Sequence, residues 1–384
     1  MRLAIIRKRY TPYGGAERFI GQLAVPLSKE GLDITIVADS WNGQTVTGMQ
    51  WIQAKAAGLT RLGREKTFHQ AVQAILSRES FDLVQSHERF IGADICRLGD
   101  GLHRAWIDRY RSISPVWRKW AIAADPFHRR ILSIESAMVA HPQTQFVANS
   151  TLIRDELQQY YGLSNSRITV IPNGVDTAHF RPATATQIVG ARVALGVPTD
   201  AFVVSAVGSG FKRKGFFELI KAMATLPDVI LLIAGKDKAA HQLKRLIDRL
   251  GLSRRATLLG PVQDVREVYW ASDVFALPSL YDPSSNAVLE ALASGLPVLT
   301  TLNVGSAREI IQAQAGVICS RTAGSIARGI LECKEKKAYF SGNSRELALA
   351  FSQKEILVQW LALYERVLAS RKNRGHSISQ GVIS

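Results

Sequence analysis

The sequence is poor in cysteine. Its 384 residues include three, Cys96, Cys319 and Cys333, and no two of them form a C-x-x-C pair. Disulfide frameworks and cysteine-based zinc sites need more cysteines, or more closely spaced ones. We therefore expect a protein of a reducing compartment that has no structural metal.

Long apolar runs are also missing. No stretch approaches the roughly 18 uninterrupted apolar residues that a membrane-spanning helix requires. The chain enters an apolar run at Leu3–Ile6 without a charged and then apolar leader, so no signal peptide is expected. Because 47% of the residues are hydrophobic and 21% are charged, the composition is that of a globular protein. These features favour a cytoplasmic protein.

Acidic residues are few relative to basic ones. The chain has 32 Asp and Glu against 48 Lys and Arg, which gives a formal net charge of +16 at pH 7. A basic excess of this size implies acidic partners, such as nucleic acid, anionic lipid or a phosphorylated substrate. Charge alone does not choose among these three.

Short apolar runs alternate with longer segments of helical character. This alternation predicts parallel sheets covered by helices on both faces. Because the chain is long for a single core, we expect two doubly wound α/β domains, separated by a linker at 178–199 that is rich in Thr, Pro and small residues. The expected strands are 3–6, 34–38, 83–85, 146–148, 168–171, 203–207, 229–234, 257–259, 274–277, 298–300 and 317–319.

Two acids lie eight positions apart in the stretch 279–301. Asp282 is in a loop after an apolar strand, and Glu290 is about two turns into the helix that two serines can cap. At ~1.5 Å rise per residue the helix between them is ~9 Å long, too long for a shared proton or metal. The spacing suits an extended ligand such as a sugar–pyrophosphate–nucleoside lying across the helix N-terminus. The alternative is an ordinary strand–loop–helix with two solvated acids.

A second loop carries cations. Val207–Gly215 reads V-G-S-G-F-K-R-K-G, in which small residues, three cations and a glycine precede a helix. Lys214 supplies a point charge, Arg213 can fork onto phosphate oxygens, and the helix N-terminus adds its dipole. The pattern indicates a phosphate site, and the alternative is a basic loop that binds none.

The first half offers weaker signals. Gly14 and Gly15 follow the first strand and permit close backbone approach, although such a pair is more often only a turn and matches neither G-x-G-x-x-G nor a Walker loop. Asp100 precedes a glycine, and His103 is a lone histidine. Residues of these two kinds are usually structural.

Residues 103–130 combine cations with aromatic side chains. They include seven Lys or Arg and two Asp, interleaved with Trp106, Tyr110, Trp117, Trp120 and Phe127. The interpretation that we rank first is that this segment binds an anionic membrane surface or a phosphorylated glycolipid. A solvated helical face with some core aromatics and a nucleic-acid stripe are the other two interpretations.

Together these motifs resemble glycosyltransferase family 4, whose members are retaining enzymes of the GT-B fold. Asp282-x7-Glu290 is similar to the family's E-x7-E motif, with Asp in place of the first Glu. The Gly-Gly loop, the run Ile171-Pro-Asn-Gly-Val-Asp176, the R-K-G loop and the acid pair occur in the family's order. The resemblance covers nearly the whole chain and is nearest to the glucosyltransferases of lipopolysaccharide core assembly.

The resemblance implies a fold and an activity. It implies two Rossmann-like domains facing a central cleft, with 1–177 on the acceptor side, 200–355 binding the nucleotide sugar, and a C-terminal helix at about 356–372 packing back on the first domain. The expected activity is that of a retaining hexosyltransferase that moves a sugar from a nucleotide-sugar, most often a UDP-sugar, to a lipid-linked saccharide such as the lipopolysaccharide core. Because no two Asp are separated by one residue, we expect no divalent metal and no cofactor.

The resemblance also assigns roles to residues. Arg213 and Lys214 would hold the pyrophosphate, Asp282 the donor sugar and Glu290 the ribose, while Asp100 and His103 would act on the acceptor side. The catalytic set is thus Asp282, Lys214, Arg213, Asp100 and His103. Many members of the family carry an Arg at the position of Ser209, so the extra contact of that Arg is not expected here. Val262 lies in a loop that resembles the one by which the family contacts the donor base through main-chain atoms. The expected donor-binding set is Gly14, Gly15, Ser209, Arg213, Lys214, Val262, Asp282, Pro283, Ser284, Ser285, Asn286, Ala287 and Glu290.

Because related enzymes often act on lipid-linked acceptors, we expect residues 103–130 to contact an anionic membrane, with the protein peripheral on the inner face of the plasma membrane. No nucleic-acid partner is expected. Two alternatives stay open. A nucleic-acid-binding protein would show steeply salt-dependent binding and ignore nucleotide sugars. A non-catalytic scaffold of the same fold would bind nucleotide without transferring sugar.

Overall fold

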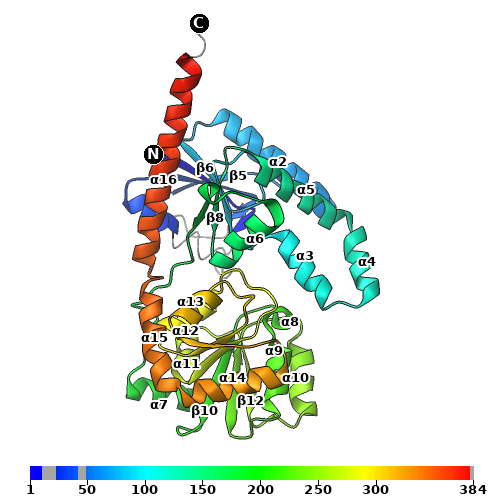
Figure 1. Cartoon of the computed structure of the whole chain (residues 1–384), viewed down its shortest axis with the longest axis vertical. Coiled ribbons are helices and arrows are strands. Elements are labelled where there is room, and N and C mark those ends of the chain that lie inside the picture. Colours follow the sequence, from blue (N-terminus) through cyan, green and yellow to red (C-terminus); the bar gives the residue numbers. More distant parts are fainter. Residues whose placement is uncertain (11–22, 42–48, 381–384) are drawn as a thin grey trace. The chain divides into compact units, whose positions relative to one another are not determined.

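The computed structural model of the protein describes residues 1–10, 23–41 and 49–380. The chain divides into two compact units (Figure 1). The first unit consists of Met1–Asn173 and Lys354–Ser384, and the second of Gly174–Gln353. No helix in the described ranges is both long and apolar enough to cross a bilayer.

The first unit is built on a seven-stranded sheet in the order β5-β3-β1-β6-β7-β8-β9, in which every pair is parallel. A small pair, β2 (Arg9–Tyr10) and β4 (Ser40–Trp41), lies beside it. Five of the seven strands coincide with expected runs, whereas β5 and β7 do not. The strands are β1 (Arg2–Ile6), β3 (Asp33–Ala38), β5 (Met49–Gln53), β6 (Leu83–Ser86), β7 (Ile95–Leu98), β8 (Gln145–Ala148) and β9 (Ile168–Val170).

The C-terminal helix α16 (Gln353–Gln380) packs against this sheet. Its apolar side chains share one core with strand residues such as Leu3, Ile5, Ile34 and Ile36, and its Trp360 is completely buried. The residues of α16 in this core are Ile356, Trp360, Leu363, Tyr364 and Val367. These five residues recur every three or four positions and therefore form one face of α16, which is the face that the helix buries.

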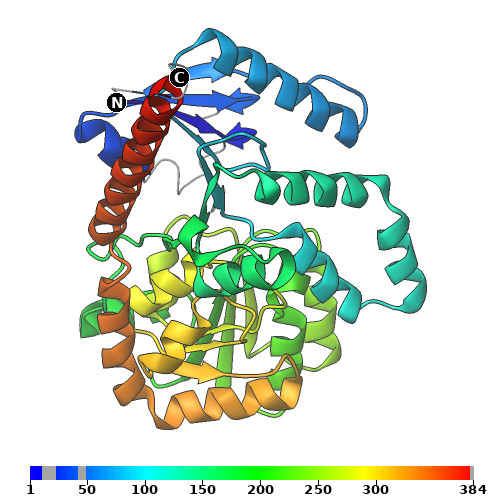
Figure 2. The same cartoon turned by 45° about the horizontal axis from the view of Figure 1, so that its top comes forward.

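Three helices, α3 (His103–Ser112), α4 (Val116–Ala124) and α5 (Pro126–Ala140), connect β7 to β8. Figures 1 and 2 show α4 at the outer end of this connection, away from the first unit's sheet. The expected segment 103–130 corresponds to α3, α4 and the start of α5. The remaining helices of this unit include α2 (Arg61–Arg78) and α6 (Thr151–Tyr161).

The second unit is built on a six-stranded parallel sheet in the order β12-β11-β10-β13-β14-β15. The chain starts at the central strand β10 and adds β11 and β12 on one side of it. It then adds β13, β14 and β15 on the other side, so the direction of strand order reverses between β10 and β13. Ligands of doubly wound sheets bind at the carboxyl ends of the strands at such a reversal. The strands are β10 (Phe202–Val207), β11 (Val229–Ala234), β12 (Ala256–Gly260), β13 (Val274–Leu277), β14 (Val298–Thr300) and β15 (Gly316–Ile318).

Helices cover both faces of the second sheet, and a large and a smaller core fill the space beneath them. Their bounds are α7 (Ala185–Ala194), α8 (Phe211–Lys214), α9 (Phe216–Met223), α10 (Ala240–Arg249), α11 (Val265–Trp270), α12 (Asn286–Ala293), α13 (Ala307–Gln312), α14 (Ala323–Glu335) and α15 (Lys337–Leu349).

The segment 178–199, expected to be a linker, is structured instead. Helix α7 begins with a capping box between Thr184 and Gln187, and Ala191 and Val197 share a core with Val203 of β10. The segment therefore belongs to the second unit. The boundary between the two units lies between Asn173 and Gly174. The Thr, Pro and small residues of 178–199, which suggested a linker, belong to the start of α7 and to the turns that flank it.

Candidate active site

Two loops meet at the carboxyl edge of the second sheet, at the reversal of strand order. One follows β10 and contains residues 208–215, and the other follows β13 and contains residues 278–285. Because β10 and β13 are hydrogen-bonded neighbours, the loops that follow them are adjacent. The cationic motif and the first acid of the pair are thus brought together.

The loop after β10 is shaped by glycine. At Gly208, φ is +136°, and a Cβ would lie 2.7 Å from Cε of Lys214, so only glycine lets this lysine lie along the backbone. Asp237, which follows β11, accepts from the backbone N–H groups of Gly210 (2.7 Å) and Phe211 (3.2 Å). These contacts fix the start of α8 and thereby the direction of its cations.

Gly215 brings the two loops into direct contact. It has a φ of +81°, and a Cβ there would lie 2.1 Å from the carbonyl oxygen of Pro278. The Leu280 N–H donates to the carbonyl of Arg213 at 2.7 Å, and Nη1 of Arg213 donates to the carbonyl of Tyr281 at 2.7 Å. The backbone around the cations is therefore tied to the backbone around the acid.

Arg213, Lys214 and Asp282 form an ion cluster. Nζ of Lys214 lies 2.8 Å from Oδ2 of Asp282, and Nη1 of Arg213 lies 3.5 Å from the same oxygen. The side chains of Lys214 and Asp282 are 9% and 10% exposed, whereas that of Arg213 is 38% exposed. Burial by itself would raise the pKa of Asp282, but Lys214 and Arg213 outweigh it and hold this pKa below its ordinary value.

The second acid is held from a different helix. Glu290 is buried little more than one turn into α12, which begins at Asn286 and not two turns before this acid as expected. Its Oε2 accepts from the hydroxyl of Tyr269 on α11 at 2.8 Å. Asp282 and Glu290 thus have separate partners. This arrangement agrees with the expectation that they do not share a proton.

Ser285 occupies the N-cap position of α12, as the sequence predicted, but its hydroxyl makes no cap bond to the helix. Its Oγ is buried and has no hydrogen-bond partner among the described residues. A buried hydroxyl without a partner is unfavourable unless a ligand or water supplies one. The N-terminus of α12 therefore has unused hydrogen-bonding capacity beside the ion cluster.

The other expected donor residues are distributed along the same edge of the sheet. Ser209 is exposed in the loop after β10, and Val262 lies in the loop after β12, half-buried against the core on that face. Gly14 and Gly15 lie outside the described residues. The remaining four follow Asp282 into the first turn of α12, namely Pro283, Ser284, Asn286 and Ala287.

In the first unit, Asp100 follows β7, and its side chain is 64% exposed. Its carboxylate lies 3.6 Å from Nη1 of Arg7, which also lies 3.4 Å from Glu88. Arg7 follows β1 and Glu88 follows β6, so this polar group is at the reversal of the first sheet's strand order. Burial raises the pKa of Glu88, and Arg7 only partly counteracts it.

His103 is the first residue of α3, and its ring contacts His128 and Trp106. Its Nε2 lies 3.0 Å from Nδ1 of His128, and its ring stacks on Trp106 with 5.7 Å between centroids. Burial and then the charge of Arg89 lower the pKa of His103 to about 4, despite the opposing effect of Glu135. The imidazole is therefore neutral at physiological pH and suited to hydrogen bonding without charge.

Several residues that shape these sites have no local sequence signal. Asp237, Tyr269 and Glu135 act across 26, 21 and 32 positions of sequence respectively, so no short motif contains both partners. Arg7 comes directly after a predicted strand and Glu88 three residues after another, so both could have been found as polar residues that follow strands. In the described parts of the chain no group of three or more His, Cys, Asp or Glu side chains forms a potential metal site.

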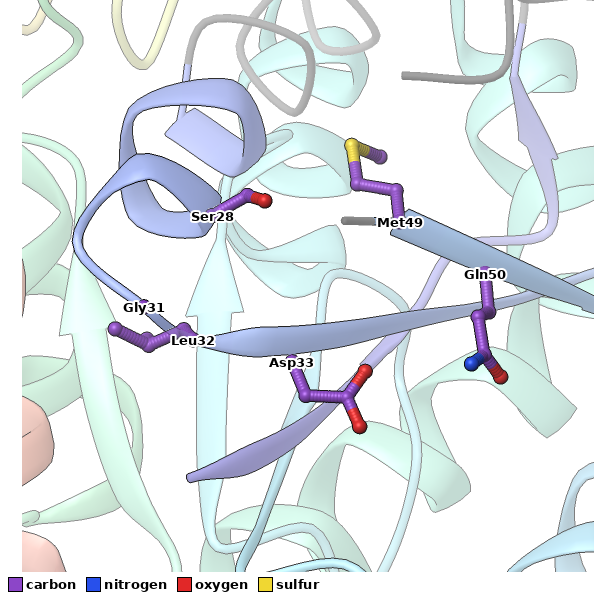
Figure 3. A pocket seen from close by; sticks show the side chains of 6 residues that line it. All are labelled: Ser28, Gly31, Leu32, Asp33, Met49 and Gln50. Carbon is purple, nitrogen blue, oxygen red and sulfur yellow. The ribbon is translucent and has the colours of Figure 1, made fainter. Parts of the chain in front are cut away.

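A hollow of about 410 Å³ lies in the first unit at the amino ends of β3 and β5. Figure 3 shows the side chains that line it, including Asp33, Met49 and Gln50. Ligands of doubly wound sheets bind at the opposite, carboxyl edge. We therefore assign this hollow no part in the site.

Two family models match the chain in succession. The model of Glycosyltransferase Family 4 matches residues 13–179, and that of Glycosyl transferases group 1 matches residues 191–347. Together they span most of the chain and include the loops that carry Arg213, Lys214 and Asp282.

Individual proteins agree with these matches. D-inositol 3-phosphate glycosyltransferase of Corynebacterium urealyticum is 28% identical over 83% of each chain. Lipopolysaccharide glucosyltransferase WaaG of Escherichia coli is 24% identical over 83% of this chain and 85% of WaaG. A crystal structure of WaaG superposes with a TM-score of 0.80 at 21% identity, covering 93% of this chain and 99% of that one. HepE of Anabaena with UDP-glucose gives 0.73 at 19% identity, covering 96% and 100%.

The two parallel sheets with their surrounding helices match those of GT-B glycosyltransferases, which confirms the fold that the motifs implied. The ranges matched by the two family models include the Gly-Gly loop, the cationic loop and the acid pair. The chain accordingly belongs to glycosyltransferase family 4 and is a hexosyltransferase with the GT-B fold.

Proposed function

We propose that this enzyme transfers a hexose, with retention of configuration, from a UDP-sugar to a lipid-linked saccharide such as the lipopolysaccharide core. The observation that carries the proposal is the cluster of Arg213 and Lys214 beside the N-terminus of α12, where the Ser285 hydroxyl has no partner among the residues that the structure describes. WaaG is named as a lipopolysaccharide glucosyltransferase, and HepE was solved with UDP-glucose, which support this choice of acceptor and donor.

The chemistry needs stabilisation of a leaving group. When the bond between the anomeric carbon and the diphosphate oxygen breaks, its electron pair stays on the diphosphate. The acceptor hydroxyl oxygen bonds the carbon and passes its proton to the departing diphosphate. Fixed cations and helix N–H groups aimed at that developing charge supply the large catalytic term. Arg213, Lys214 and the first turn of α12 have this character, and on this proposal they act without a divalent metal.

The other roles follow the same assignment. Glu290, oriented by Tyr269, would accept from the ribose hydroxyls, and backbone near Val262 would contact the base. Asp282 would contact the donor sugar. Asp100 and His103 would belong to the acceptor side in the first unit, where the neutral imidazole is suited to a sugar hydroxyl.

The decisive experiment is a thermal-shift screen of UDP-, GDP- and ADP-glucose in EDTA, because a ligand that binds the folded state raises the melting temperature. We expect a shift with UDP-glucose that Glu290→Ala abolishes. Glu332→Ala, which removes an exposed acid of α14, is the matched control and should retain the shift. Failure of all three nucleotide sugars to shift the folded wild type would contradict the proposal.

We further propose that α4 rests on the anionic inner face of the plasma membrane. Trp117 and Trp120 are 69% and 73% exposed, and Val116 and Ile113 are exposed beside them. Arg118 lies in the same helix. Exposed tryptophans flanked by cations are typical of segments that lie in the membrane interface.

Vesicle sedimentation tests this contact. The wild type should sediment with vesicles that contain phosphatidylglycerol and remain in solution with pure phosphatidylcholine. The double variant Trp117→Ser/Trp120→Ser should lose most of this binding with an unchanged melting temperature. Trp51→Ser, at an exposed tryptophan of β5, is the control and should bind as the wild type does.

A further inference from the structure

We infer that Asp282 is an internal counter-ion of the phosphate-binding cations, and that the diphosphate of a donor must displace it before this acid can reach the donor sugar. The inference rests on the proposed function, because it concerns the same site. It adds that the acid and the diphosphate compete for Arg213 and Lys214.

The first support is the shared oxygen. Both cations point at Oδ2 of Asp282, with Lys214 at 2.8 Å and Arg213 at 3.5 Å. A phosphate oxygen would bind these cations in the same way, since a carboxylate and a phosphate are interchangeable partners for Lys and Arg. In this structure the carboxylate therefore occupies the position that the proposed function gives to a phosphate oxygen.

The second support is burial. Lys214 and Asp282 are both about nine-tenths buried, and a buried charge that loses a close opposite charge is costly. Lys214 therefore needs a counter-ion whether or not a donor is bound. Asp282 supplies it in the donor-free protein, and a diphosphate with its higher charge can take this role over.

The third support is that only side chains need to move. The backbones of the two loops are fixed to each other by the contacts of Gly215 with Pro278 and of Leu280 with Arg213. The Asp282 backbone is held on its other side, because its N–H donates to Asn303 at 3.0 Å and its carbonyl accepts from Gly305 at 2.9 Å. Rotation of the Asp282 side chain away from Lys214 is then sufficient for the exchange.

This exchange has a consequence for the reaction. While Asp282 is paired with Lys214, its carboxylate is engaged and is a poor partner for sugar hydroxyls. Once a diphosphate has bound the cations, repulsion between the two anions drives the carboxylate away from them. A free sugar without a diphosphate is therefore not recognised, and the donor is bound diphosphate first.

The test is calorimetric titration with inorganic pyrophosphate, a probe that contains neither base nor sugar. Asp282→Asn removes the competing charge, so we expect it to bind pyrophosphate about tenfold more tightly than the wild type and with a steeper dependence on salt, because one more cation is available to the ligand. Asp248→Asn removes an acid that pairs with Lys244 on the surface of the same unit, and it should bind as the wild type does. This control separates displacement from a general change in charge.

The two hypotheses fail differently. If the folded wild type and Asp282→Asn both show no pyrophosphate binding, the phosphate site and the proposed function are wrong. If the wild type binds and Asp282→Asn binds equally or more weakly, the counter-ion role alone is wrong. Should Asp282→Asn not fold, Asp282→Ser makes the same comparison, since serine also carries no charge at this position.

Discussion

At the scale of single residues, Glu290 depends on a side chain from another helix. The Tyr269 hydroxyl donates to its carboxylate at 2.8 Å, and the tyrosine ring is buried in the core of the second unit. The hydroxyl therefore orients the acid while the ring serves packing. These two contributions can be separated, because phenylalanine keeps the ring.

We expect Tyr269→Phe to weaken UDP binding by about tenfold, since a hydrogen bond to a charged group contributes about 1.5–3 kcal/mol and its loss lets the carboxylate turn. Pyrophosphate binding should not change, because Glu290 is assigned to the ribose. Calorimetric titration with both ligands measures this difference. An equal loss for UDP and pyrophosphate would show that the hydroxyl supports the whole site and not Glu290 in particular.

Three buried or half-buried histidines predict how stability depends on pH. The pKa of His103 falls to about 4 because of burial and Arg89, and burial also lowers the pKa values of His69 and His87. Between pH 6.5 and about 4 these three histidines bind protons in the unfolded chain that they do not bind in the native state. The free energy of unfolding should therefore be highest above pH 6.5 and decrease as the pH falls towards 4.

Urea unfolding at a series of pH values measures this slope. His103→Gln should flatten it over that range, because one of the groups that bind protons only in the unfolded state is gone. His241→Gln, at an exposed histidine of α10, should leave the slope unchanged. If His103→Gln does not alter the dependence of the unfolding free energy on pH, the pKa of His103 is not lowered in the native state.

At the scale of elements, the start of α3 is held by one buried acid of α5. Leu102 at the N-cap has no side chain that can cap the helix, and Glu135 accepts from the backbone N–H groups of His103 (2.6 Å) and Arg104 (3.1 Å) instead. The same carboxylate accepts from Arg89 at 2.9 Å and from the hydroxyl of Tyr161 at 2.7 Å. A negative charge at a helix N-terminus also interacts favourably with the helix dipole.

We expect Glu135→Gln to lower the free energy of unfolding by about 3 kcal/mol, because it leaves Arg89 without its buried opposite charge. Urea denaturation measures the change, and hydrogen exchange of residues 103–106 should accelerate more than that of β1. Glu79→Gln removes an exposed acid that lies 3.3 Å from Arg2, and should cost less than about 1 kcal/mol. Similar losses of unfolding free energy in the two variants would mean that the buried charge of Glu135 stabilises the protein no more than an exposed one.

At the scale of the whole molecule, the chain passes from the first unit to the second and back. The helix α16 belongs to the first unit although it is the last element in the sequence, so the first unit cannot complete its core until the second has been synthesised. Trp360 is the largest fully buried side chain in the molecule's described part and lies in that helix.

We expect Trp360→Ala to destabilise the first unit by about 3–5 kcal/mol, the usual cost of truncating a buried tryptophan. Unfolding of the second unit should be unaffected, so that differential scanning calorimetry resolves two transitions in place of one. Val358→Ala changes an exposed residue of the same helix and is the control. A single transition that shifts as a whole would instead show that the two units unfold together.

Local sequence patterns determined most of the elements of this protein. All eleven expected runs coincide with or overlap strands, because a strand buried on both faces of a parallel sheet must be apolar over its whole length. The two strands missed in the first unit's sheet break this rule. Arg97 interrupts β7 and is nevertheless buried, and β5 lies at the sheet edge, where Gln50 and Trp51 are exposed.

What the tertiary structure alone decided is which side chains meet. Lys214 and Asp282 are 68 positions apart, and Glu135 gathers partners from three other segments of the chain. Periodicity and motif spacing describe neighbours within one element, whereas these contacts depend on the order of the strands and on which loops therefore share an edge. The sequence by itself thus determined the elements, the family and the two charged motifs. The folded sheet decided that the acid of one motif neutralises the cations of the other, because it makes β10 and β13 neighbours.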